Sequence, residues 1–108
     1  MAALRVEGLP VGALEAAAVF HAEWLPRARE MLSEGHLVLI FPRAVHTHRA
    51  WRLAAVQGLA REYAPLRVNA IASGSEPAIA SARAYLERAQ GFTGQYLPLD
   101  DAGAGLVV

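Results

Sequence analysis

The sequence predicts a small three-layer α/β domain with a mostly parallel sheet and about three helices. Two nearly continuous apolar runs, His36–Phe41 and Leu66–Ala72, are typical of strands buried on both faces. Stretches with helical spacing separate the runs, and this alternation favours a parallel sheet with right-handed crossovers. The chain has 108 residues, of which 55% are hydrophobic, enough for one domain over residues 1–108.

The first half of the chain predicts a strand, a long helix and a second strand. Ala3–Leu9 alternates between apolar and polar residues, which indicates a short strand. Ala13–Ser33 has apolar residues at three-four spacing and therefore predicts an amphipathic helix. Pro26 lies inside it and lacks an N–H group, so we expect a kink near residues 22–25 or two helical pieces. Pro42 ends the strand at His36–Phe41.

The second half predicts two helices, each followed by a strand. Thr47 is expected to cap a helix over His48–Tyr63, and Ser75 is expected to cap a third helix over Glu76–Gln90. The strands that follow them are Leu66–Ala72 and Gln95–Leu99. Residues 102–108 are expected to form a flexible tail whose last three residues dock or pair.

Composition excludes several classes of function. Ten arginines balance ten acidic residues, so the chain has no basic surface for nucleic acid or an anionic membrane. The absence of cysteine excludes disulfides, thiolate zinc sites and cysteine nucleophiles, and the absence of lysine excludes Schiff-base chemistry. No apolar run approaches the roughly 20 residues that span a bilayer, and no signal peptide is recognised, so the expected location is cytoplasmic.

The helix over His48–Tyr63 is apolar around most of its circumference, with only Arg49, Arg52, Gln57, Arg61 and Glu62 as a polar minority. One sheet cannot cover such a helix, so the pattern predicts a homo-oligomer, a dimer or a tetramer, with this helix in the interface. The alternative is a monomer that tolerates the exposure, because alanine and glycine carry little apolar area. The expected interface residues are Trp24, Trp51, Ala55, Leu59 and Tyr63.

Three segments resemble one known family. Residues 58–71 (GLAREYAPLRVNAI) resemble the run that follows the catalytic helix of short-chain dehydrogenases/reductases, and residues 92–100 (FTGQYLPLD) resemble a late segment of that family. Residues 35–40 resemble the strand that carries the catalytic serine at its end. The resemblance covers roughly residues 13–101, but only the second half of a family member. It implies a Rossmann-like fold.

The chain departs from the family at the positions that carry chemistry. By this alignment the catalytic tyrosine falls on Val45, its lysine on Arg49, and the serine on Phe41 or Pro42. No glycine-rich loop for a dinucleotide pyrophosphate is present. Ser73-Gly74 stands where the family has Pro-Gly. The departures predict a protein that has lost catalysis and cofactor binding, self-associates, and scaffolds a full-length dehydrogenase/reductase.

Two other functions stay open at this point. In the first, an NAD- or NADP-dependent oxidoreductase subunit shares a pocket across an oligomer, around Asn69, Ser73, Gly74 and Thr93. In the second, a small-molecule sensor uses the crevice at the carboxyl ends of the strands.

Isolated polar residues add no stronger hypothesis. His46 and His48 resemble a metal pair, but the spacing identifies no third ligand, so no metal site is predicted and both are expected to face solvent. His21 is expected to be packed or at the interface. No serine lies in a nucleophile motif, and the acidic pair Asp100-Asp101 fits a turn. The remaining cluster, which fits an exposed face or an anion site, is Arg43, Arg49 and Arg52.

Overall fold

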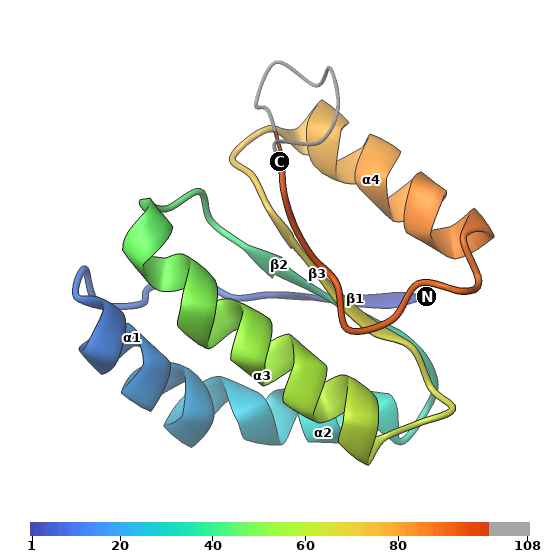
Figure 1. Ribbon diagram of the computed structural model, residues 1–108, viewed down its shortest axis with the longest axis horizontal. Helices are drawn as coiled ribbons and strands as arrows, with labels where there is room; N and C mark the ends of the chain where they lie inside the picture. The colour runs from blue at the N-terminus through green and yellow to red at the C-terminus, as the bar shows by residue number, and fades with distance from the viewer. Residues whose placement is uncertain (100–108) are drawn as a thin grey trace.

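The computed structural model describes residues 1–99 and contains one sheet of four parallel strands (Figure 1). The strands stand in the order in which the chain forms them: β1 (Ala2–Arg5), β2 (Leu37–Phe41), β3 (Val68–Ala72) and β4 (Tyr96–Pro98). The predicted α/β class and parallel sheet are confirmed. The expected tail at residues 102–108 and the pair Asp100-Asp101 lie outside the described residues.

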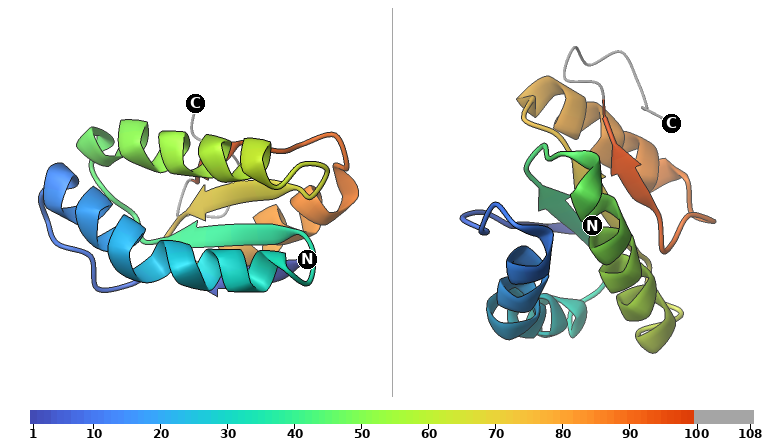
Figure 2. Two further views of the ribbon diagram at one scale, coloured as in Figure 1. Left: turned by 90° about the horizontal axis from the view of Figure 1, so that it is seen from below. Right: turned by 60° about the vertical axis from the view of Figure 1, so that its left-hand side comes forward.

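Helices cover both faces of the sheet, which gives the three layers (Figure 2). The first face carries α1 (Ala13–Val19), a π-helical segment η1 (Phe20–Trp24), α2 (Leu25–Leu32) and α3 (Arg49–Glu62). Among residues 1–99, α4 (Glu76–Arg88) is the only helix on the second face. Side chains of β2 alternate between the two cores because successive residues of a strand point to opposite faces. Both central strands are therefore buried throughout, as their apolar runs predict.

The connection from β3 to β4 differs from the expected right-handed crossover. Each new strand is added on the same side of its predecessor, but α4 lies on the opposite face from the helices of the first two connections. The third crossover therefore has the opposite hand, and the prediction of uniform right-handedness is wrong here. Uniform handedness would place every helix on one face and leave Val38, Ile40 and Ile71 in contact with water.

Pro26 produces the expected disturbance in the first long helix. It stands in the first turn of α2, and the residues just before it form the π-helical segment η1. Because proline has no N–H group and its ring crowds the preceding turn, the backbone widens instead of continuing the regular pattern. Of the two predicted outcomes, a kink or two helical pieces, the second is confirmed: α1 and α2 are separate α-helices joined by η1.

The end of β1 and the start of α3 differ most clearly from their predictions. β1 ends at Arg5 and not at Leu9, because Gly8 adopts a positive φ of 71° and turns the chain away. Thr47 does not cap the second long helix: it lies inside a 3-10 turn, η2 (His46–His48), and His48 occupies the cap position without a side-chain bond. A preceding turn already directs the chain into the helix, so no hydroxyl cap is needed there.

Ser75 caps α4 as predicted, with its hydroxyl accepting a hydrogen bond from the Ala78 amide at 3.3 Å. We expect Ser75→Ala to lower the free energy of unfolding by about 1 kcal/mol, because one amide of the first turn loses its partner. Chemical denaturation measures the effect. Ser81→Ala is the control: Ser81 is exposed within the same helix, and alanine there is expected to be neutral or slightly stabilising. Equal effects of the two changes would contradict the capping role.

Among residues 1–99, no helix has the length and apolar character needed to cross a membrane.

Candidate functional site

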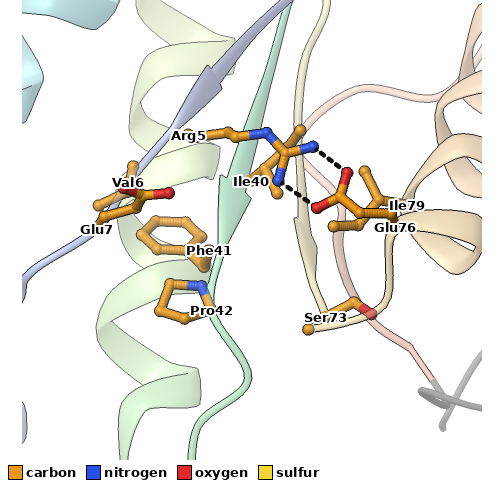
Figure 3. A pocket seen from close by; sticks show the side chains of 10 residues that line it. Arg5, Val6, Glu7, Ile40, Phe41, Pro42, Ser73, Glu76 and Ile79 are labelled. Atoms are coloured by element: carbon orange, nitrogen blue, oxygen red, sulfur yellow. Dashed lines mark hydrogen bonds and ion pairs between the residues drawn. The ribbon is translucent and has the colours of Figure 1, made fainter.

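A hollow of about 190 Å³ lies at the carboxyl ends of the first three strands (Figure 3). Open parallel sheets bind ligands at this edge, so the hollow is a candidate ligand-binding site. Its volume is below the roughly 300–1,000 Å³ of ordinary small-molecule pockets. It is lined by Arg5, Val6, Glu7, Ile40, Phe41, Pro42, Ser73, Gly74, Glu76 and Ile79.

Three polar side chains of the hollow, those of Arg5, Ser73 and Glu76, are engaged in hydrogen bonds within the chain. Arg5 donates two hydrogen bonds to the Glu76 carboxylate, at 3.0 and 2.7 Å, and this pair joins the end of β1 to the start of α4. The Ser73 hydroxyl accepts a hydrogen bond from the Ser75 amide at 3.0 Å and so shapes the turn into α4. These hydrogen bonds stabilise the end of β1, the turn after β3 and the start of α4 at this edge of the sheet.

The four residues expected to form a shared cofactor pocket lie in two separate places. Ser73 and Gly74 line the hollow at the carboxyl end of β3. Thr93 accepts a hydrogen bond from the Val68 amide, at the amino end of the same strand, roughly 13 Å away along the strand axis. Thr93 lines a different depression beside α3, with Gln57 and Arg61. One chain therefore does not bring the four residues together, and their joint role in an oligomer stays a prediction.

Asn69 is fully buried, and its amide holds the segment that leads into β4. It donates to the Phe92 carbonyl at 3.0 Å and accepts from the Gln95 amide at 3.1 Å. We expect Asn69→Leu to destabilise the domain by about 2–4 kcal/mol, because the main-chain groups of Phe92 and Gln95 both lose their partner. Thermal unfolding measures the loss. An unchanged transition temperature would contradict this structural role for the amide.

The positions aligned with the family's catalytic residues carry no group for proton transfer to a substrate. Val45 lies in the loop after β2 with 67% of its surface exposed. Arg49 begins α3, and its guanidinium lies over the Tyr96 ring at 5.8 Å. Phe41 is buried in the core, and Pro42 contributes only its ring and carbonyl to the edge of the hollow.

The structure places His46 on the surface and His48 in the interior. His48 is only 6% exposed, so its expected exposure is wrong. Its Nδ1 accepts a hydrogen bond from the Trp51 indole N–H at 3.0 Å, and its Nε2 lies 2.9 Å from the Val11 carbonyl. Because indole only donates, Nε2 carries the proton and both ring nitrogens are used. Within the described part of the chain, no cluster of three or more acidic, histidine or cysteine residues fits a metal ion.

Arg52 is a second polar residue whose predicted environment is wrong. The sequence pattern places it in the polar minority of its helix, but it is only 2% exposed and lies beneath the ends of β2 and β4. It donates to the Pro42 carbonyl at 2.9 Å and to the Tyr96 hydroxyl at 3.2 Å. Its guanidinium also lies 4.6 Å from the Phe41 ring centroid. The contacts with aromatic rings and with the Pro42 carbonyl offset part of the cost of burying the guanidinium.

A second surface feature is a groove of about 220 Å³ between η1–α2 and α3. Two rows of side chains at i, i+4 spacing form its walls. At one end Arg29 bonds the Glu62 carboxylate and the Tyr63 hydroxyl, and these bonds raise the pKa of Arg29 above its ordinary value. The lining residues are His21, Leu25, Arg29, Ala54, Ala55, Gly58, Leu59 and Glu62.

Two of the five expected interface residues, Ala55 and Leu59, line this groove. Trp24, Trp51 and Tyr63 are half-buried, and Tyr63 is bonded to Arg29 at one end of the groove. Leu59 is only 3% exposed and belongs to the core. The exposed side of α3 is formed mainly by the small residues Ala50 and Ala54 and by Gln57 and Arg61. His21, expected to be packed or at the interface, is exposed and lines the groove.

A comparison with models of protein families identifies the family of this parallel α/β chain. The family model SDR-like, described as short chain dehydrogenase-like protein, matches residues 4–99. The chain belongs to this family. No curated protein and no solved structure matches this SDR-like chain. Family membership thus confirms the resemblance seen in residues 35–40, 58–71 and 92–100, whereas the function of this SDR-like chain rests on its own geometry.

Proposed function

We propose that this SDR-like chain is non-catalytic and acts by self-association through the groove between η1–α2 and α3. A scaffolding role for a full-length relative follows if that relative carries a matching helical face. The observation that carries the proposal is an open groove with one wall of very small residues, on a chain whose aligned catalytic positions are Val45 and Arg49.

The small residues of α3 favour contact with another helix. Ala54 and Gly58 stand one turn apart, and a Cβ atom added at Gly58 meets nothing within 4 Å. A helix of a second copy can therefore approach closely, as ridges that enter grooves require. Association about a two-fold axis would bring the same groove of both copies together and cover apolar area that a monomer leaves in water.

Gly58→Arg tests this surface without disturbing the core. The new side chain enters open space, and the loss of a helical glycine favours the helix by roughly 1 kcal/mol, so the fold is expected to stay intact. A bulky cation in the groove is expected to lower self-association through this face at least tenfold, which analytical ultracentrifugation measures. Gly58→Ala is the matched control and should associate like the unchanged chain. If Gly58→Arg associates as strongly as the control, the groove is not the contact.

The alternative is an NAD- or NADP-dependent oxidoreductase subunit, and the hollow beside Ser73 and Gly74 is the observation that favours it. Its volume of about 190 Å³ is small for a dinucleotide, and Arg5 is paired with Glu76 within it. We therefore expect isothermal titration with the oxidised and reduced forms of both dinucleotides to give no heat of binding up to about 1 mM. Micromolar binding would instead support a cofactor site rebuilt in the oligomer and would overturn the non-catalytic proposal.

A further inference from the structure

We infer that the outer edge of β1 pairs with β1 of a second copy, antiparallel and about a two-fold axis, to form one continuous sheet. This contact goes beyond the groove proposed above and does not depend on it. The amides of Ala2 and Val6 donate to the β2 side, to the carbonyls of His36 and Ile40 at 3.2 and 2.8 Å.

In a pair of parallel strands, every second residue of a strand directs both its N–H and its C=O group toward the neighbouring strand. The residues between them direct both groups to the opposite side. Ala2, Leu4 and Val6 therefore face β2, and Ala3 and Arg5 direct their N–H and C=O groups away from it. Within residues 1–99, β1 has a strand on one side only. An edge with unpaired groups is a template for another strand.

Contacts on both faces hold β1 extended and ready for pairing. Leu4 packs against the core beneath α1–α3, and Ala3 packs against the core beneath α4. The amino group of Met1 lies 3.1 Å from the Glu87 carboxylate, and Arg5 bonds Glu76, so both ends of β1 are fastened to α4. A strand fixed in this way loses little further conformational freedom on association.

The short strand is complementary to itself. In an antiparallel register centred on Leu4, Ala3 of each copy stands opposite Arg5 of the other. The two hydrogen-bonded pairs then exchange four main-chain hydrogen bonds, and Leu4 meets its counterpart on the apolar face. No like charges stand directly opposite. The two α4 helices come to lie antiparallel on one face, which brings Glu76 of one copy toward the second half of α4 in the other, where Arg83 and Arg88 stand with Glu87.

Hydrogen exchange and sedimentation in the Gly58→Arg background test the pairing, because that change removes the groove contact. We expect a dimer whose Ala3 and Arg5 amides exchange at least tenfold more slowly at high than at low protein concentration. The Leu4 and Val6 amides, which face β2, serve as the internal reference. Ala3→Pro removes the outward N–H and no bond to β2, so it should yield a monomer, whereas Ala3→Val should stay dimeric.

Two results would overturn the inference. One is a Gly58→Arg protein that is monomeric at every concentration. The other is a dimer in which the Ala3 and Arg5 amides exchange rapidly while those of Leu4 and Val6 remain protected. Neither result bears on the groove. Its role is tested by the difference in self-association between the Gly58→Arg and Gly58→Ala proteins. Either proposal can therefore be wrong while the other is right.

Discussion

Leu59→Arg is expected to unfold the domain and not to release folded monomers. Leu59 is 3% exposed and packs in the core between α3 and the sheet. A guanidinium at this position would lose its hydration without a partner, and the leucine contacts would be lost as well. We expect a loss of more than about 4 kcal/mol, a large part of the stability of a domain of this size.

Circular dichroism and urea denaturation measure this loss. Gly58→Arg is the control, since it introduces the same charge at the adjacent residue, where a side chain enters open space. A well-folded Leu59→Arg protein would show that α3 can shift away from the sheet. Any study of the interface should accordingly change Gly58 or Ala54, because changes at Leu59 affect folding and association together.

Arg52→Ala is expected to destabilise the domain by about 3 kcal/mol, chiefly through lost packing. The side chain fills the space beside the Phe41 and Trp51 rings, and its removal leaves a cavity and frees the Pro42 carbonyl and the Tyr96 hydroxyl. Within residues 1–99 no carboxylate forms an ion pair with Arg52, and its Nε has no hydrogen-bond partner. Its positive charge therefore contributes little to stability.

Arg52→Met separates packing from charge. Methionine keeps most of the volume and removes the buried cation, so the stability of this variant is expected to lie within about 1 kcal/mol of the unchanged chain. Denaturation curves of the two variants give the comparison. If the Arg52→Met and Arg52→Ala proteins were equally unstable, the hydrogen bonds of the guanidinium would be the dominant contribution and the packing argument would be wrong.

Local patterns predicted most of the elements because the responsible interactions are local. Ser75 and its partner Ala78 are three residues apart, and the effect of Pro26 acts on the preceding turn. The runs at residues 37–41 and 68–72 are apolar because both faces of each strand are covered, a property that the sequence records directly. The family resemblance was also visible in short segments and is confirmed over residues 4–99.

The environment of Arg52 could not be predicted in this way. A charged residue on a helix is normally exposed, and nothing near Arg52 in sequence indicates that Phe41, Pro42 and Tyr96 meet around it. The only available signal is indirect: aromatic residues on the strands to either side of β3 can shelter a guanidinium. The buried state of His48 has a similar origin, since its partner Val11 comes from a distant loop.

By itself, the sequence determined the α/β class, the parallel sheet, the cap of α4 and the family, because each depends on periodicity, on neighbours within a turn or on runs of aligned residues. Only the tertiary structure decided that α4 crosses to the opposite face and that Asn69 and Thr93 lie far from Ser73 and Gly74 along β3. It also decided that no strand among residues 1–99 pairs with the outer edge of β1. The physical reason is that these features depend on which buried faces remain to be covered once the strands are paired, and on contacts between residues far apart in the chain.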